Sequence, residues 1–326
     1  MICNICHGET ADRTFKVREM VFGYRDEFEY FECGNCGCLQ IKEYPNELCK
    51  YYPSNYYSFG DAEIKQDNLI FKWAKKRRAL YGLGRNSLIG SIITKVKNLP
   101  KFYEILRQCN LNLDSKILEI GCGSGFFLKQ MQREGFTDLV GIDPYLPGGK
   151  VKEEGVPKLL RRDLFEYCST RGDKFDLVML HHTLEHMSDQ KRVFSELFNL
   201  IKVNGFVWIT MPVVGYAWRH YAVNWCGLDA PRHLIIHSRK SIRLLCNETS
   251  FDIVDITYNS TEYQFLASEQ YSKDIALLDS RSYIVNSKNS FFSDRQIEVF
   301  RTKAIELNKN QDGDSASFLL RKSKGD

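Results

Sequence analysis

The sequence predicts an α/β protein in which a doubly wound, mostly parallel sheet follows a small N-terminal module of the zinc-ribbon type. Three observations support this prediction. From Asp114 onward, apolar strand-like runs alternate with helical patterns, which is typical of a parallel sheet covered by helices on both faces. Within that region a glycine-rich segment leads from a strand into a helix. Ahead of it, two C-x-x-C pairs stand in the first 38 residues.

The bulk composition is that of a globular protein. With 326 residues, of which 43% are apolar, the chain has room for about two domains and a substantial core. Its formal net charge of +4 is too balanced to imply a nucleic-acid partner. Residues 1–20 contain no apolar signal region and no apolar run reaches ~18 residues, so we expect no transmembrane segment. Eleven cysteines without a secretory context indicate the reducing cytoplasm.

Five of the cysteines fall at the front of the chain. Cys3 and Cys6 form one C-x-x-C pair, and Cys33 and Cys36 form a second. Each pair can turn two thiolates toward one ion, so the two pairs predict a closed, structural Zn2+ site. Buried thiols without metal are the alternative, and a redox pair is disfavoured because two pairs occur. Two further residues are spare ligand candidates, His7 and Cys38.

The front of the chain is expected to form a small unit of its own. Residues 14–30 alternate apolar and polar side chains enough to predict a short antiparallel ribbon between the cysteine pairs. A unit this small needs its metal to fold. We assign residues 1–60 to this module and a tyrosine-rich linker, residues 61–113 to a helical connector, and residues 114–326 to the main domain.

The connector carries aromatic and basic clusters. The tyrosines of residues 51–59 are expected to pack the module onto the next domain, or else to border the active site. Helices are expected over residues 68–81 and 88–108. The basic run from Lys75 to Arg78 is either a solvated helix face or a contact for an anionic membrane or substrate.

Strands of the main domain are predicted where apolar residues gather between turn signals, over residues 116–120, 139–142, 157–160, 175–180, 206–211, 251–257 and 315–321. A capped helix is expected over residues 238–247, and residues 262–309 are expected to be irregularly helical. In a doubly wound sheet, ligands lie beyond the carboxyl ends of the strands. The informative residues should therefore follow strands.

The segment E-I-G-C-G-S-G, residues 119–125, follows the first of these strands. Gly121, Gly123 and Gly125 let the backbone approach a ligand closely, and the helix start behind them presents free N–H groups. Glu119 is unsuited to a pyrophosphate but suits a cationic ligand such as S-adenosylmethionine. In this form the segment resembles the first motif of the class I S-adenosylmethionine-dependent methyltransferases. A glycine turn without a ligand is the alternative.

The resemblance implies a Rossmann-like, seven-stranded sheet whose last strand inserts antiparallel beside the fifth. It also implies cofactor contacts. Glu119 would hold the amino group or a water beside it, and the backbone at His181 would pass the methionine part. Asp143 would accept the ribose hydroxyls, and Asp163 with Leu164 would bind the adenine. Both aspartates are also candidates for helix caps.

Six of the seven histidines lie between residues 181 and 237. His182 and His186 stand in H-T-L-E-H, which resembles a segment after the fourth strand of many small-molecule methyltransferases. Histidine is the natural base for a hydroxyl proton at neutral pH. We therefore rank His182 and His186 first as catalytic residues, followed by His233. A structural, hydrogen-bonded imidazole is the alternative for each.

Residues 212–238 form an aromatic-rich insertion, in a position where loops carry specificity. Within it, D-A-P-R-H-L resembles a segment of bacterial methyltransferases linked to cell-surface polysaccharide and other sugar biosynthesis, and the zinc module matches the same group more loosely. Arg232 suits a phosphate or carboxylate of a sugar nucleotide, or equally an intramolecular ion pair.

We therefore expect a zinc-stabilised enzyme that moves the methyl group of S-adenosylmethionine to a hydroxyl of a sugar, nucleotide sugar or similar small metabolite. Carbon methylation of a keto-sugar is open, since a histidine could equally remove a carbon-bound proton. The rivals are an RNA methyltransferase anchored by the zinc module and a non-catalytic adaptor. No nucleic-acid partner is expected, and the sequence does not specify an oligomeric state.

Overall fold

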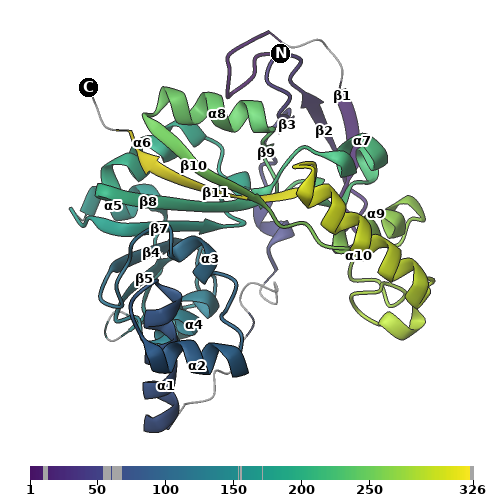
Figure 1. Cartoon of the computed structure of the whole chain (residues 1–326). Coiled ribbons are helices and arrows are strands. Elements are labelled where there is room, and N and C mark those ends of the chain that lie inside the picture. The colour runs from purple at the N-terminus through teal and green to yellow at the C-terminus, as the bar shows by residue number, and fades with distance from the viewer. Residues whose placement is uncertain are drawn as a thin grey trace.

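The computed structural model describes residues 1–9, 14–53, 60, 68–152, 154, 156–170 and 172–323. Two sheets organise the chain, one of four strands and one of seven (Figure 1). The order in the larger sheet is β10-β11-β8-β7-β4-β5-β6. Its neighbouring strands are parallel except where β11 pairs antiparallel with β10 and β8. The predicted Rossmann-like methyltransferase fold is therefore confirmed.

Each strand of the larger sheet overlaps a predicted one. The strands are β4 (Lys116–Ile120), β5 (Asp138–Ile142), β6 (Lys158–Leu160), β7 (Phe175–His181), β8 (Ile201–Pro212), β10 (Phe251–Tyr258) and β11 (Ser315–Lys322). The largest difference in bounds is at β8, which begins at Ile201 because its first residue pairs with Phe175 before the register shifts. Asn204, in the left-handed region at φ 65, lies inside that irregularity.

Helices cover both faces of this sheet. One face packs on α5 (Leu164–Thr170), α6 (Gln190–Leu200) and α8 (Arg239–Glu248), and the other packs on α1 (Leu69–Gly82), α3 (Tyr103–Leu106) and α4 (Phe126–Glu134). Along β4 the side chains alternate between the two layers, since Leu118 and Ile120 join the first and Ile117 joins the second. Burial on both faces explains why the parallel strands read as continuous apolar runs.

The predicted single helix over residues 88–108 is wrong. The structure has α2 (Leu88–Val96) and α3, separated by a segment that contains Pro100. Proline lacks an N–H donor and disfavours helical backbone in the residue before it, so a helix does not continue through Pro100. The other predicted connector helix is present as α1, with the Asn68 side chain as its N-terminal cap.

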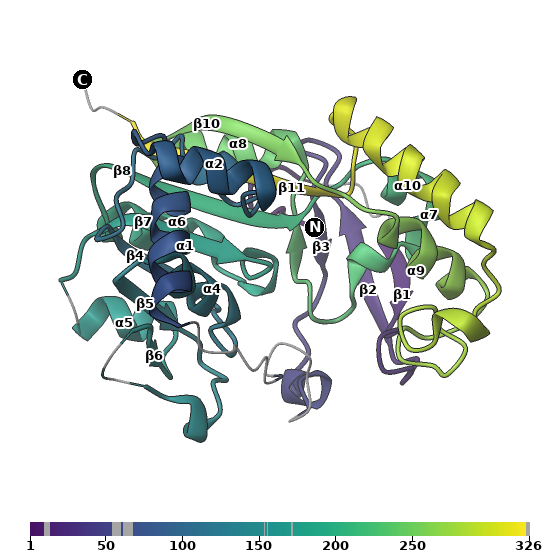
Figure 2. The same ribbon diagram turned by 60° about the horizontal axis from the view of Figure 1, so that its bottom comes forward.

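The smaller sheet is formed by β1 (Thr14–Arg18), β2 (Glu27–Glu32), β3 (Leu39–Ile41) and β9 (Ile235–Ile236). The first three strands contain the predicted antiparallel ribbon. Strand β9 comes from the insertion and pairs with β3, Leu39 facing Ile236. The cysteines of the front and apolar residues of the insertion share one core, so the two regions pack as one body (Figure 2).

The remaining helical elements are short or lie toward the C-terminus. They are η1 (Leu48–Tyr51), η3 (Gly148–Lys150), η4 (Leu184–His186), α7 (Tyr216–Tyr221), η5 (Ala222–Asn224), η6 (Cys226–Leu228), α9 (Tyr263–Ser272), η7 (Ser287–Asn289) and α10 (Asp294–Lys309). Residues 262–309 are thus helical at both ends and mostly irregular between. Within the described ranges, no helix has the length and apolar character required to cross a bilayer.

Candidate functional site

The glycine segment forms a tight cradle between β4 and α4. Gly121, Gly123 and Gly125 have φ values of 70, 52 and 72, in the left-handed region that favours glycine. A Cβ atom on Gly121 would lie 2.3 Å from the Thr183 hydroxyl, and one on Gly125 would lie 2.7 Å from the Leu159 side chain. The first and third glycines are therefore required both by backbone conformation and by space.

Asp143, directly after β5, ties the cradle to the next strand. One carboxylate oxygen accepts the backbone N–H of Gly123 at 3.0 Å, and the other accepts that of Tyr145 at 2.8 Å. Burial raises the pKa of this carboxyl, while the two N–H donors oppose the rise. Asp143 therefore caps a turn rather than a helix, and its side chain borders the cavity beside the cradle.

Glu119, two residues before the first glycine, has a carboxylate oxygen without a hydrogen-bond partner among the described residues. Its Oε1 lies 3.1 Å from Nδ1 of His181, whereas its buried Oε2 has no hydrogen-bond partner among the described residues. Burial raises the pKa of Glu119, and the contact with His181 lowers it in part. A buried acceptor without a partner costs about 1–3 kcal/mol. The site is thus suited to a ligand that brings a cationic donor.

A cavity of about 430 Å³ lies beside the cradle, and Glu119, Gly123 and Gly125 are not among the residues that line it. Seven of the residues predicted to bind cofactor or act in catalysis line it: Gly121, Asp143, Asp163, Leu164, His181, His182 and His186. Asp163 is exposed and also accepts the N–H of Glu166 at 2.8 Å, so it caps α5 as the alternative interpretation proposed.

The tyrosine-rich segment contributes to both roles proposed for it. Tyr51 is buried and donates to Asp26 of the N-terminal module at 2.6 Å. Tyr52 lines the first cavity, stacks on Tyr145 and lies 3.1 Å from Nδ1 of His186. Residues 54–59, with the other tyrosines of this segment, lie outside the described residues.

A second cavity of about 470 Å³ adjoins the first, and His182 and His186 line both. Its other walls come from the insertion, from the segment after β10 and from the start of β11. These walls are mostly polar and aromatic and include His233, Asn259, Ser260, Thr261, Tyr263 and Asp314. The structure therefore brings His182 and His186 to the boundary between the two cavities, and His233 to the wall of the second.

Glu185 lies at the centre of these histidines and is completely buried. Its Oε1 is 3.4 Å from Nδ1 of His182 and 3.9 Å from Nε2 of His233. Burial alone would raise the pKa of Glu185, but the surrounding histidines outweigh it and hold the pKa at about 2. Sequence reasoning did not select Glu185, although its position within H-T-L-E-H was a signal.

The hydrogen bonds of the imidazoles define which ring nitrogens are available. Nδ1 of His186 lies 2.8 Å from the carbonyl oxygen of Arg232, and Nδ1 of His233 lies 2.8 Å from that of Gly227. A carbonyl only accepts, so each Nδ1 carries the proton and each neutral ring has its lone pair on Nε2. Glu185, His186 and His233 also place ligand atoms within 4.8 Å of one another, as a metal site would require.

Two other histidines of the cluster in sequence lie elsewhere. His237 is completely buried, with Nε2 2.5 Å from Gln190 and Nδ1 2.8 Å from Ser241, and burial lowers its pKa to about 4. His220 is exposed on α7 and stacks on Tyr216. For these two, the structural alternative holds.

Arg232 forms an intramolecular ion pair rather than a substrate contact. The fully buried guanidinium lies 3.1 Å from both carboxylate oxygens of Asp229 and 3.2 Å from Glu19. Glu19 in turn accepts three backbone N–H groups of the N-terminal module. The insertion is thereby locked to the module.

Replacing Arg232 by methionine should lower the free energy of unfolding by about 3–5 kcal/mol, because two carboxylates then remain buried without their counter-charge. Denaturant unfolding followed by circular dichroism measures the change. Arg219→Met is the matched control, since its ion pair with Asp312 is exposed and contributes less than about 1 kcal/mol. Equal stability of the two variants would show that the buried ion pair does not hold the module.

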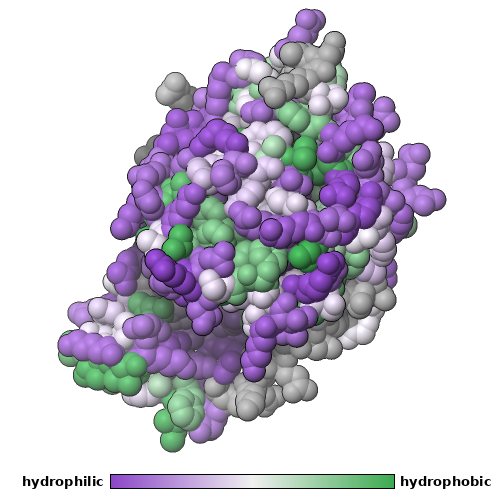
Figure 3. Space-filling view, turned by 90° about the vertical axis from the view of Figure 1, so that its right-hand side faces the viewer, coloured by the Kyte–Doolittle hydropathy of each residue, from purple (hydrophilic) through white to green (hydrophobic). Residues whose placement is uncertain are grey.

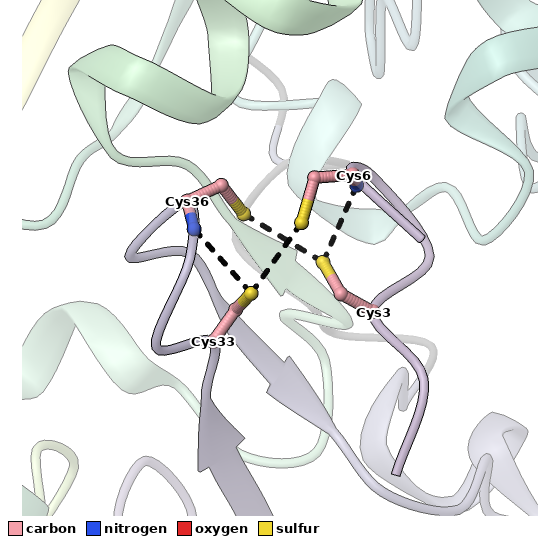
Figure 4. A group of neighbouring side chains, drawn as sticks. All are labelled: Cys3, Cys6, Cys33 and Cys36. Atoms are coloured by element: carbon pink, nitrogen blue, oxygen red, sulfur yellow. Dashed lines mark hydrogen bonds between the residues drawn. The ribbon is translucent and has the colours of Figure 1, made fainter. Parts of the chain in front are cut away.

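The four predicted cysteine ligands meet in the N-terminal module, with their sulfur atoms pointing toward one another (Figure 4). The Sγ atoms of Cys3 and Cys36 are 3.6 Å apart, and those of Cys6 and Cys33 are 3.5 Å apart. Zn–S bonds of about 2.3 Å in a tetrahedron place the sulfurs about 3.8 Å apart, close to this spacing. The donor set thus fits a zinc ion.

Cys38 lies beside this cluster. Its Sγ is 3.3 Å from that of Cys36 and 3.6 Å from that of Cys3. Gln40 donates to the sulfurs of Cys3 and Cys38 at 2.9 and 3.0 Å. A thiolate that accepts a hydrogen bond in this way is typical of an ordered metal-binding shell.

Comparison with known proteins agrees with the fold. A family model described as a methyltransferase domain matches residues 96–256. The ubiquinone biosynthesis O-methyltransferase of Azorhizobium caulinodans is 32% identical over 98 residues, which cover 28% of this chain and 38% of that protein. The protein of the same name from Bartonella tribocorum is 23% identical over 51% of this chain and 73% of its own length. The chain thus spans between about a third and three quarters of these relatives.

Among solved structures, a SAM dependent methyltransferase from Archaeoglobus fulgidus aligns with 78% of this chain and all of its own. Its sequence identity is 20% and the TM-score is 0.42.

Proposed function

We propose that this chain, whose residues 96–256 match a methyltransferase-domain family model, is a class I S-adenosylmethionine-dependent methyltransferase that transfers the methyl group to a hydroxyl of a sugar, nucleotide sugar or similar small metabolite. The observation that carries the proposal is the pair of adjoining cavities with His182 and His186 in their common wall. Methyl transfer is an in-line displacement, so donor and acceptor must approach from opposite sides of one boundary.

The first cavity is suited to the donor. The orphaned Oε2 of Glu119 would receive the amino group, and the glycine cradle would admit the backbone of the cofactor's methionine part near His181. Asp143 would accept the ribose hydroxyls, while Asp163 and Leu164 would border the adenine. When bound, the cofactor supplies an activated methyl group. The chain's own residues align it and exclude water.

The second cavity is suited to a polyhydroxylated acceptor. Asn259, Ser260, Thr261 and Asp314 supply donors and acceptors, and Tyr263 supplies an aromatic surface on which a sugar ring can pack. Small sites of this kind are specified by a few polar groups in fixed positions. Arg232, which sequence analysis offered for a sugar-nucleotide phosphate, is occupied by Asp229 and Glu19 and has no part in this proposal.

His182 is the proposed general base. Its side chain is 58% exposed, in contact with both cavities, and it lies beside Glu185. Crowding by protein atoms opposes its protonation, but the Glu185 carboxylate outweighs this and raises the pKa of His182. A base whose pKa lies near the working pH is the most effective acceptor of a hydroxyl proton. His186 and His233, anchored through Nδ1, would position the acceptor.

The N-terminal cysteines would hold a structural zinc ion, since four buried or half-buried sulfurs meet the geometric requirement and leave no open position.

Two measurements test the proposal. Calorimetric titration of zinc-replete protein with S-adenosylmethionine should show one site, and absence of binding would overturn the donor assignment. Incubation with radiolabelled cofactor and a panel of nucleotide sugars should label at least one of them. If the labelled methyl group is found on a carbon atom of the product rather than on an oxygen, the acceptor atom is carbon.

Asp143→Ala should weaken S-adenosylmethionine binding by at least tenfold, since it removes a charged acceptor of ribose hydroxyls and leaves Gly123 N–H without its partner. Asp138→Ala, at the exposed start of the same strand, should leave affinity unchanged. Calorimetry measures both variants. Unchanged affinity in Asp143→Ala would remove this residue from the donor site.

A further inference from the structure

Helices α1 and α2 form a basic and apolar extension at the lower end of the molecule (Figure 1). Residues 68–103 contain nine lysines and arginines and no aspartate or glutamate. Several large apolar side chains of these two helices are exposed. We define the α1–α2 face by Leu69, Ile70 and Trp73 of α1 and by Leu88, Ile92 and Val96 of α2, of which Leu69, Leu88 and Val96 are each more than 80% exposed.

The helix pair is a built part of the fold. A Cβ atom on Gly90 would lie 2.2 Å from the Arg77 carbonyl, so the backbones of α1 and α2 are in direct contact there. Arg78 of α1 forms a buried ion pair with Glu134 of α4. The two helices are therefore held against the main domain with exposed apolar side chains, and Figure 3 shows green apolar patches among hydrophilic residues at this end.

A basic cavity lies beside the helices. It has a volume of about 200 Å³, and its charged lining consists of Lys75, Arg78, Lys97, Arg133 and Glu134. Four cationic side chains and one carboxylate thus line the cavity. A phosphate group is an anion small enough to fit this cavity and to bind its lysine and arginine side chains.

We propose that the α1–α2 face docks the protein peripherally onto an anionic lipid bilayer, with its apolar side chains among the headgroups and a lipid phosphate in the basic cavity. Helices that lie in a membrane interface combine Lys and Arg with Trp, Phe and Leu on the opposite face. On α1 a basic and an aromatic side chain lie in contact, since the Arg77 guanidinium is 5.6 Å from the centroid of the Trp73 ring.

Other occupants of this face fit less well. A second copy would set the nine lysines and arginines of residues 68–103 against the nine of its partner. RNA would satisfy the charges but would leave the large aliphatic side chains against phosphate and sugar. An anionic bilayer satisfies both the charge and the apolar area.

Co-sedimentation with vesicles tests the proposal. The protein should bind vesicles of phosphatidylcholine with about one third phosphatidylglycerol, bind phosphatidylcholine alone at least tenfold more weakly, and dissociate as salt rises. Trp73 gives an independent signal because it is half exposed, whereas Trp208, Trp218 and Trp225 are buried. Its emission should shift to shorter wavelength on binding, and Trp73→Phe should lose the shift while still sedimenting.

Matched variants locate the contact. Leu88→Ser and Ile92→Ser should each weaken vesicle binding by about tenfold, and Lys97→Ser by about fivefold. Val203→Ser and Lys288→Ser, equally exposed but on other surfaces, should bind as the unsubstituted protein does. The proposal is overturned if anionic vesicles are not bound, if the face variants bind equally well, or if Ile92→Ser instead abolishes a dimer or RNA binding.

Discussion

Removing zinc from the N-terminal module should unfold that module and abolish methyl transfer, while S-adenosylmethionine binding stays within about twofold. Zinc contributes on the order of 10 kcal/mol to the folding of small metal-binding domains. The module supplies Val21 to the second cavity, and Tyr30 donates to the backbone carbonyl of His233 at 2.8 Å. The first cavity takes Tyr52 from residues 1–60, but its glycine cradle depends on β4 and α4. Acceptor and donor sites should therefore respond differently.

Cys33→Ser, or treatment with a strong chelator, produces this state. The zinc content measured by metal analysis should fall below one ion per chain. Hydrogen exchange should accelerate in residues 14–41 and in Ile235 and Ile236. Cys49→Ser is the control, because that thiol is exposed and lies outside the cluster. Zinc-free protein with unchanged exchange and full turnover would show that the cysteines are structural thiols without metal.

His182→Ala should lower kcat by about 10²- to 10⁴-fold on the acceptor that the sugar panel identifies, with the affinity for S-adenosylmethionine unchanged. The substitution removes the proposed base but none of the groups of the glycine cradle. His186→Ala should also lower turnover, through loss of acceptor positioning. His220→Ala, on the exposed surface of α7, is the control. Full turnover in both His182→Ala and His186→Ala would exclude a catalytic role for them.

The pH profile provides a second readout of the same assignment. A base acts in its neutral form, so kcat should rise with pH through the pKa of His182, which Glu185 raises above the ordinary value near 6.5. Glu185→Gln removes the carboxylate and should move this limb to lower pH. A limb that does not move would assign the titration to another group.

The sheet and the glycine cradle were predictable because their causes are local. Residues of parallel strands are buried on both faces and form short apolar runs. The left-handed backbone at Gly121 and Gly125 leaves glycine as the residue that fits. Asp143 follows its strand directly, and that position alone brings it to the cradle. The helix break near Pro100 could also have been predicted from the sequence. The prediction of one helix over residues 88–108 gave too much weight to the spacing of apolar residues.

Other features depend on contacts between distant segments. Glu185 is one residue of a motif in the sequence, and only folding surrounds it with three histidines. The partners of Arg232 include Glu19, more than 200 residues away. The spacing of Leu69, Trp73 and Ile92 indicates helix faces but not whether another element covers them. Tertiary neighbours decide such questions, and local pattern does not contain them.

The pairing of β3 with β9 has a consequence for how the chain is made. Leu39 leaves the ribosome about 200 residues before its partner Ile236. At about 5–20 residues per second, translation leaves the edge of β3 without that neighbour for tens of seconds. During this interval the cysteine thiols are open to oxidation and to incorrect pairing. Early binding of a metal ion by the nascent polypeptide would protect them.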